Sequence, residues 1–166
     1  MRKLDHDSIS HDRVAIRVAR LADRPELIRL IRAYYRLDHI RFDARAMEPA
    51  LARLLRSRAL GRVWIMQDGA KAVGYVVLTF NYDLEFDGLE GLVTDLFVEA
   101  KYRGTGLGKR ALEVVDDYCR KRGIRAVELQ VESNNTAAQA FYRKIGFTQL
   151  ARVVMVRDIK YFGGAD

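Results

Sequence analysis

The sequence is short of several residues and patterns that would each define a class of protein. It has 166 residues, with a single cysteine and two prolines. One cysteine excludes an internal disulfide and agrees with a reducing compartment. No apolar run approaches the roughly 20 residues of a membrane helix, and residues 1–8 lack the apolar core of a secretory signal. We therefore expect one cytoplasmic domain over residues 1–166, not bound to a membrane, with residues 1–12 flexible.

Histidine is also scarce. The three histidines, His6, His11 and His39, have no metal-ligand spacing with one another or with Cys119. We therefore expect no metal site. Cys119 lies on the inward side of a helical pattern, which is typical of a buried, inert thiol rather than a nucleophile.

The net charge of +7 has two interpretations, a nucleic-acid surface or a solvated helical surface with a phosphate site. Basic residues are spread along the chain, and the arginine-rich N-terminal third contains no run of three of them. We therefore favour the second interpretation and do not expect nucleic acid as a partner.

Apolar spacing and turn residues predict an α/β domain, with a mixed sheet and helices on both faces. The predicted elements are a strand at 14–19, helices at 24–35 and 45–58, strands at 62–67 and 72–80, a turn at 81–91, a strand at 92–98, a helix at 107–122, a strand at 126–131, a helix at 135–145, and one or two strands at 147–158. Asp68-Gly69 predicts a hairpin turn. Gly74, inside a strand, suggests a bulge or a close backbone approach.

A glycine-rich loop joins the central strand to the helix that follows it. Its sequence is Arg103-Gly104-Thr105-Gly106-Leu107-Gly108-Lys109. Glycines permit positive φ and let a bulky anion approach the backbone, and the helix N-terminus adds free N–H groups and a positive dipole end. The loop therefore predicts a phosphate site.

Two common phosphate motifs do not fit this loop. The Rossmann fingerprint requires a glycine where the chain has Lys109, and a Walker A loop requires a glycine at Arg103 and Ser or Thr at Arg110. The loop belongs to neither class.

The pattern that fits is Arg-x-x-Gly-x-Gly after a strand ending in Leu-Phe-Val, which resembles the acyl-CoA motif of the GCN5-related N-acetyltransferases (GNAT family). A second piece of the family pattern follows at the expected distance, because residues 135–147 resemble its Asn-x-x-Ala-x-x-Phe-Tyr-x-x-x-Gly-Phe helix. The resemblance covers residues 62–158, and the N-terminal third agrees in layout only.

The resemblance implies acetyl-CoA as cosubstrate and a mostly antiparallel, twisted sheet whose fourth and fifth strands splay to admit the pantetheine arm. It also implies that homodimers are possible. The residues expected to bind the cofactor are Leu96, Phe97, Val98, Arg103, Gly104, Thr105, Gly106, Leu107, Gly108, Lys109, Asn135, Ala138 and Tyr142.

Tyr142 is the candidate acid for the leaving thiolate. It shares a helix face with Asn135 and Ala138, which precede it at spacings of seven and four, and a neutral phenol can donate to sulfur. The alternative is a core tyrosine beside Phe141. Asn135 is expected to contact the pantetheine, to cap its own helix, or to do both.

The general base is less defined. Related polyamine-type acetyltransferases carry a glutamate where this chain has Thr94, and Asp95 is adjacent. Neighbours on a strand point to opposite faces, so Asp95 does not simply replace that glutamate. Asp95 is either catalytic or a structural carboxylate. A water chain ending at a nearby carboxylate, or no dedicated base, are further alternatives.

An acidic stretch in an otherwise basic chain indicates the acceptor. Residues 81–95 contain five carboxylates and no Lys or Arg, and such a rim would attract a cationic amine. The alternative is a solvated turn. The residues expected to bind the acceptor are Tyr34, Asp38, Asp83, Glu85 and Glu90.

We therefore expect acetyl transfer from acetyl-CoA to a primary amine by direct attack in a ternary complex. The expected acceptor is a small cationic amine such as a polyamine, a diamine or an amino-acid side chain. The alternatives are a protein acetyltransferase, acting on lysine or an N-terminus, and a non-catalytic acyl-CoA sensor.

Overall fold

The computed structural model describes residues 13–157 and 159. The expected flexibility of residues 1–12 concerns residues outside this description. The chain forms two compact units, Met1–Gln130 and Val131–Asp166, and each is described by itself below. The single domain over residues 1–166 stays a prediction.

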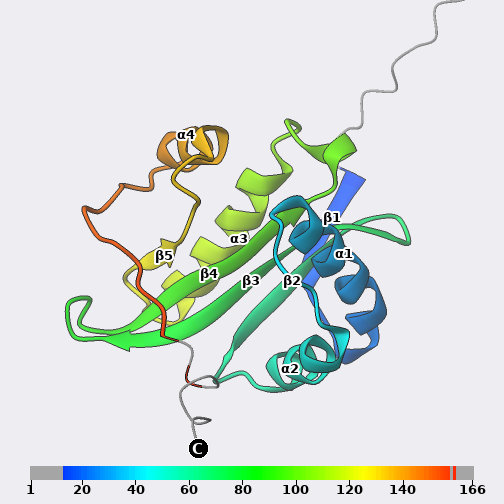
Figure 1. The fold of residues 1–166 in the computed structure, drawn as a ribbon, viewed down its shortest axis with the longest axis horizontal. Coiled ribbons are helices and arrows are strands. Elements are labelled where there is room, and N and C mark those ends of the chain that lie inside the picture. The colour runs from blue at the N-terminus through cyan, green and yellow to red at the C-terminus, as the bar shows by residue number, and fades with distance from the viewer. Residues whose placement is uncertain (1–12, 158, 160–166) are drawn as a thin grey trace, which may run out of the picture. The chain divides into compact units, whose positions relative to one another are not determined.

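The first unit is built on one twisted sheet (Figure 1). Its strands are β1 (Val14–Val18), β2 (Gly61–Asp68), β3 (Lys71–Asp83), β4 (Gly88–Val98) and β5 (Val127–Leu129), and they lie in this order across the sheet. The first four are antiparallel to their neighbours, while β5 runs parallel to β4. The predicted mixed, mostly antiparallel sheet is confirmed.

Helices cover both faces of this sheet, as predicted (Figure 1). On one face, α1 (Arg24–Leu37) and α2 (Ala44–Arg56) pack on a core that includes Ile65, Tyr75 and Val77. On the other face, α3 (Leu107–Lys121) places Tyr118 against Trp64 and Phe80. The two sets of strand residues alternate because successive side chains point to opposite faces. Short 3₁₀ turns, η2 (Leu21–Asp23) and η3 (Ala100–Tyr102), precede α1 and α3.

The two hairpins of the sheet test the turn predictions. Asp68-Gly69 does form the predicted hairpin, with Gly69 at φ +59°. The turn predicted at 81–91 is present but shorter, because β3 continues to Asp83, β4 begins at Gly88, and only residues 84–87 form the turn. Ladder hydrogen bonds are made by main-chain groups, so the polar side chains of this stretch did not prevent pairing. Most of the acidic stretch therefore lies in strands.

Gly74 in β3 confirms the predicted close approach. A Cβ atom there would lie 2.6 Å from the carbonyl oxygen of Phe97 and 2.8 Å from Sδ of Met66. The register with β2 also shifts beside it, between Met66 and Gln67. Only glycine lets β4 lie this close at that point.

The second unit contains α4 (Thr136–Lys144), close to the predicted bounds. The strands predicted at 147–158 are wrong for every described residue, because 147–157 contain no strand. The apolar side chains that suggested a strand, such as Val153 and Met155, are 87% and 90% exposed. A strand forms only where its main-chain groups find a partner.

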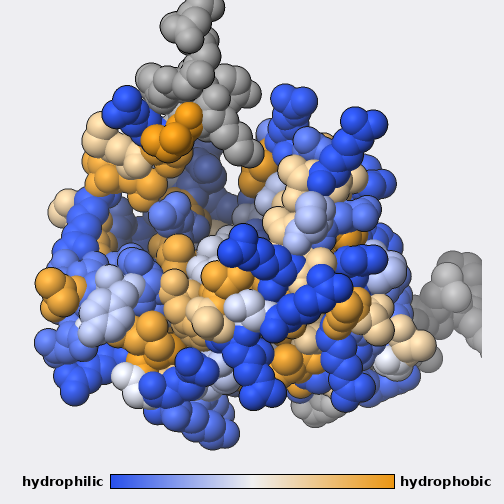
Figure 2. Space-filling model, turned by 90° about the horizontal axis from the view of Figure 1, so that it is seen from below, coloured by the Kyte–Doolittle hydropathy of each residue, from blue (hydrophilic) through white to orange (hydrophobic). Residues whose placement is uncertain are grey.

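The surface is mixed in character. Figure 2, which views the molecule from below, shows hydrophilic side chains over much of that face with apolar ones between them. Within the described part of the chain, no helix has the length and apolar character to cross a membrane.

Candidate active site

The glycine-rich loop is open where the sequence predicts a phosphate site. Gly104 and Gly106 have φ of +76° and +88°, and a Cβ atom built on either would meet nothing within 4 Å. Gly106 is the N-cap of α3, and no side chain caps that helix. Among residues 13–157, no group accepts a hydrogen bond from the N–H groups of residues 104–109. Free donors at a helix N-terminus are the arrangement that binds phosphate oxygens.

Some side chains of this loop hold it in place, and others lie on the surface. Leu107 is 1% exposed and anchors the start of α3 in the core. Thr105 Oγ1 donates to the carbonyl of Tyr102 at 2.8 Å and so holds the turn. Arg103 Nε donates to the carbonyl of Val98 at 2.8 Å, which ties the loop to the end of β4. Lys109 forms an exposed ion pair with Glu113 at 3.4 Å.

The predicted splay between β4 and β5 is present. Their pairing covers only Gly91–Val93 against Val127–Leu129. Beyond it, residues 96–98 of β4 pair with β3 on one side, and no described residue continues the sheet on the other. Main-chain groups along this edge are therefore available to a ligand that enters between the two strands.

A β-bulge sets the direction of Asp95. Val77 of β3 lies opposite Asp95, but the next residue, Leu78, lies opposite Val93, so Thr94 is an extra residue in β4. The bulge interrupts the alternation of side chains and places Asp95 on the same face as Val77, towards α1. Thr94 is exposed.

Asp95 is a partly buried carboxylate without a partner. Burial, with a smaller contribution from the nearby Asp38 carboxylate, raises its pKa to about 6. No described residue forms a hydrogen bond or an ion pair with the Asp95 carboxylate. The described residues therefore give no support to a structural carboxylate satisfied by backbone or arginine, and the catalytic role of Asp95 stays a prediction.

Aromatic side chains from α1 and β3 surround Asp95. The Tyr34 ring lies 6.0 Å from the Phe97 ring, and the Tyr75 ring lies 6.2 Å from it. Tyr75 is fully buried, and its Oη has no hydrogen-bond partner. Burial and then the charge of Asp95 raise the pKa of Tyr75 well above its usual value. This cluster brings the predicted residues Tyr34 and Asp38 to Asp95.

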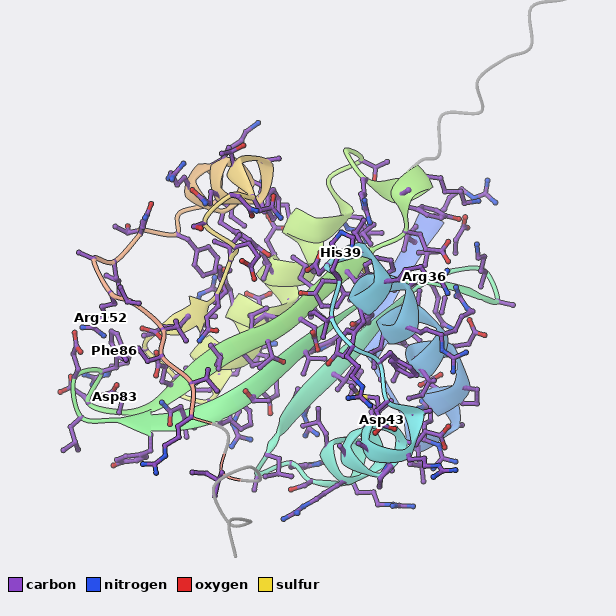
Figure 3. The ribbon with its side chains drawn as sticks, in the orientation of Figure 1. Arg36, His39, Asp43, Asp83, Phe86 and Arg152 are labelled. Carbon is purple, nitrogen blue, oxygen red and sulfur yellow. The ribbon has the colours of Figure 1, made fainter. Side chains whose placement is uncertain are left out.

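The remaining predicted acceptor residues lie at the other end of β4. Asp83 ends β3 and Glu85 lies in the β3–β4 turn that follows, where Asp83 Oδ1 accepts a hydrogen bond from the N–H of Glu85 at 2.9 Å. Figure 3 shows Asp83 at this turn, far from His39 at the end of α1. Glu90 lies near Asp83 and not beside Asp95. The five residues expected to bind the acceptor thus form two groups.

The predicted residues of α4 lie in the second unit. Asn135 Oδ1 accepts a hydrogen bond from the N–H of Ala138 at 3.0 Å, so its capping role is confirmed. Tyr142 is half-buried, with its ring 5.1 Å from Phe141 and 5.7 Å from Phe147. The roles of Asn135, Ala138 and Tyr142 towards a cofactor stay predictions.

The comparisons with known proteins decide the family. Residues 25–147 match the Acetyltransferase (GNAT) family. The chain belongs to this family.

Three similar proteins illustrate the match. An uncharacterised N-acetyltransferase of Archaeoglobus fulgidus is 29% identical over 128 residues, which are 74% of this chain and 87% of that protein. An uncharacterised N-acetyltransferase of Methanocaldococcus jannaschii is 31% identical over 87 residues, 52% of this chain but only 38% of that protein. The crystal structure of an integron cassette protein from the Cole Harbour salt marsh metagenome is 31% identical, with a TM-score of 0.78, over 95% of this chain and 96% of that one.

These matches confirm the GNAT family, the fold class and acetyl-CoA as the cosubstrate that the family uses. The matches do not test the role of any individual residue, so the cofactor and acceptor residues of this GNAT chain stay predictions. Sequence reasoning missed Tyr75 and Glu128 as neighbours of the predicted carboxylates. No local signal marks them, because their proximity depends on strand register.

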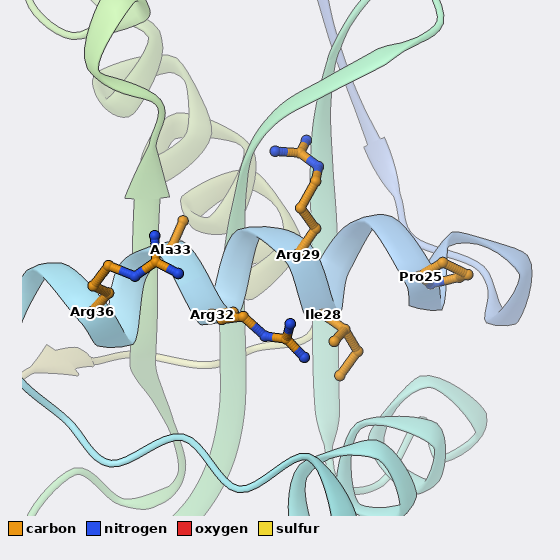
Figure 4. Close-up of a pocket in the computed structure, with 6 residues that line it drawn as sticks. All are labelled: Pro25, Ile28, Arg29, Arg32, Ala33 and Arg36. Carbon is orange, nitrogen blue, oxygen red and sulfur yellow. The ribbon is translucent and has the colours of Figure 1, made fainter.

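Two other features of this GNAT domain have no part in the predicted site. A groove of about 360 Å³ runs along α1 (Figure 4) and is lined by Pro25, Ile28, Arg29, Arg32, Ala33 and Arg36. Arg29 there is already paired with Glu26 and Glu99 at 2.9 and 2.8 Å. Cys119 is buried, as predicted, and burial raises its pKa to about 11.

Proposed function

We propose that this GNAT domain transfers an acetyl group from acetyl-CoA to the primary amine of a small cationic acceptor, by direct attack in a ternary complex. The observation that carries the proposal is Asp95. It is a partly buried carboxylate with a pKa of about 6 and no described partner, beside the splay of β4 and β5. Such a group has the pKa of a general base that works near neutral pH.

The cosubstrate fits the open loop on two counts. Residues 104–109 offer N–H groups that no described acceptor uses, and Gly104 and Gly106 leave the space free for a diphosphate. Acetyl-CoA bound there supplies the activated acetyl group. The free edge of Leu96–Val98 offers main-chain donors for the thioester carbonyl, where negative charge develops during attack.

Asp95 would prepare the acceptor. An ammonium ion entering beside Asp95 and Asp38 is attracted by both carboxylates. Asp95 then takes a proton from it, so that the free amine can attack the acetyl carbon. We assign the proton for the departing thiolate to Tyr142. The products are an N-acetylated amine and CoA.

The deciding experiment measures release of CoA thiol when the purified protein and acetyl-CoA are mixed with a panel of mono-, di- and polyamines and N-terminal peptides. We expect turnover with small cationic amines. Turnover with peptides alone would support a protein acetyltransferase. Tight binding of CoA with no turnover for any amine would replace the proposal with an acyl-CoA sensor.

Tyr142→Phe tests the acid. We expect kcat to fall roughly tenfold or more, with unchanged affinity for CoA in calorimetry. Phe141→Tyr is the matched control, because it adds a hydroxyl to the neighbouring ring and should leave kcat unchanged. Full kcat for Tyr142→Phe across the pH range would remove Tyr142 from the mechanism. The homodimer and the cytoplasmic location stay predictions.

A further inference from the structure

Two unsatisfied polar atoms mark the α1-side face of the sheet. Among the described residues, only Tyr75 Oη and Glu90 Oε1 are buried side-chain atoms without a hydrogen-bond partner. Tyr75 is 0% exposed and Glu90 is 2% exposed. Buried polar atoms are almost always paired, because leaving one unpaired costs roughly 1–3 kcal/mol. Two such atoms on one face indicate groups that await a ligand.

Strand register shows that both atoms belong to the same face. Tyr75, Val77, Thr79 and Asn81 alternate along β3 with side chains on the α1 side. Asp95 lies opposite Val77, and Glu90 lies opposite Asn81. Tyr75, Asp95 and Glu90 therefore follow one another along a single face.

Glu90 sits in a polar row across three strands. Its Oε2 accepts a hydrogen bond from Asn81 Nδ2 of β3 at 3.4 Å. On the other side, Glu128 of β5 lies opposite Leu92 and places a second carboxylate beside Glu90. Burial, and then the charge of Glu128, raise the pKa of Glu90. Two adjacent carboxylates repel each other unless they share a proton, as the contact between Glu90 and Glu128 permits, or a cation lies between them.

No described side chain supplies a cation between Glu90 and Glu128. None of the ion pairs within residues 13–157 includes Glu90, Glu128 or Asp95. A divalent metal is also a poor fit, because the described residues contain no group of three or more His, Cys, Asp or Glu that could hold one. An ammonium group, which needs acceptor oxygens alone, matches what Glu90 and Glu128 offer.

The distance between the two acidic positions follows from strand geometry. Asp95 and Glu90 lie opposite residues 77 and 81 of β3, which are four residues apart. At about 3.4 Å per residue, the two positions are roughly 14 Å apart along the sheet. This separation exceeds the size of a single ammonium group and suits the span of an extended polyamine.

We propose that Glu90 and Glu128 form a second ammonium subsite, so that the preferred acceptor is a linear polyamine whose reacting amine lies at Asp95 and whose distal ammonium lies at Glu90. This inference rests on the proposed function and names the acceptor class within it. Asn81 fixes one oxygen of Glu90 and leaves Oε1 for the ligand. Glu90 and Glu128 thereby determine specificity, while Asp95 serves the reaction.

The first test varies the distance between the reacting amine of the acceptor and its second ammonium group. Acetylation kinetics are measured at mildly alkaline pH with n-butylamine, putrescine, octamethylenediamine, spermidine and spermine, each of which has a primary amine. We expect KM to fall as the spacer lengthens towards octamethylenediamine and spermine. A KM independent of spacer length, or lowest for n-butylamine, would overturn the proposal.

The second test removes the charge of the subsite. Glu90→Gln, or Glu128→Gln if the first variant does not fold, should raise KM for spermine roughly 10- to 100-fold, the size of a lost charge-assisted hydrogen bond. The rise in KM should be larger for spermine than for n-butylamine, which has no second ammonium group. Glu48→Gln is the matched control, because it makes the same change at an exposed position of α2. Equal effects of Glu90→Gln on both amines would refute a distal subsite.

Direct binding separates this inference from the proposed function. Calorimetry with spermine in the absence of acetyl-CoA measures the acidic face alone. Spermine that binds the unmodified protein, and binds Glu90→Gln roughly tenfold or more weakly, supports the subsite even if no amine is acetylated. Acetylation of n-butylamine with no measurable binding of spermine would retain the transferase and discard the subsite.

Discussion

The two halves of β4 make a direct comparison within one strand. In its first half, Gly91–Val93 lie between β3 and β5 with paired neighbours on both edges. Its second half begins at Thr94, the bulged residue. From there on, β4 pairs with β3, and no described strand lies on its other edge. Where both ladders are present, the main-chain groups of β4 are paired. Beyond β5, the same strand presents main-chain groups on one edge and the Asp95 carboxylate, neither with a described partner, and these are the requirements of a catalytic site.

The largest expected effect comes from the carboxylate of the second half. Asp95→Asn should lower kcat/KM roughly 10²- to 10⁴-fold, the range for loss of a general base. It should also stabilise the fold at neutral pH by about 2–3 kcal/mol, because the buried charge is removed. Denaturant unfolding and steady-state kinetics measure the two effects. A variant that loses stability instead would show that Asp95 is structural.

The glycine-rich loop that follows β4 is tested by comparing two glycines that both have positive φ. Gly106→Asp should weaken CoA binding roughly 10- to 100-fold, because a carboxylate would occupy the space for phosphate. Gly123→Asp at the other end of α3 is the control, since Gly123 also has positive φ, +71°, and open surroundings. Both should cost similar stability. Calorimetry that shows equal losses of CoA affinity would contradict the site.

The pH profile sharpens the comparison further. Since the pKa of Asp95 is raised to about 6, kcat/KM should fall about tenfold per pH unit below that value. The folded pKa lies above the unfolded value of about 3.9, so the wild type loses stability as pH rises from about 4 to 6. Asp95→Asn should lack this loss. Identical stability curves for the two proteins would show that Asp95 is not desolvated.

The smallest effect concerns the extra residue itself. Val93→Ala, in the paired half, should cost about 2 kcal/mol, because Val93 is 4% exposed and its methyl groups lie in the core. Thr94→Ala should change the free energy of unfolding by less than about 0.5 kcal/mol, because Thr94 is exposed. A large cost for Thr94→Ala in denaturant unfolding would mean that its side chain maintains the bulge.

Local signals predicted much of this chain. Apolar spacing located the helices α1 to α4 and the strands β1 to β4, and Gly69 and Gly74 were placed correctly from their neighbours. The errors are also local. Polar residues at 81–91 predicted a turn that is longer than the observed one at 84–87, and apolar residues at 147–157 suggested strands that find no described partner.

The amino-acid sequence by itself determined the family, the order of the elements and the open glycine loop, because these depend on residues close together in the chain. Only the tertiary structure decided which way Asp95 points and that Glu90 and Glu128 are neighbours. One bulged residue changes which face a side chain occupies, and the pairing of β5 with β4 joins residues 36 positions apart. Neither register nor bulge leaves a mark in local composition.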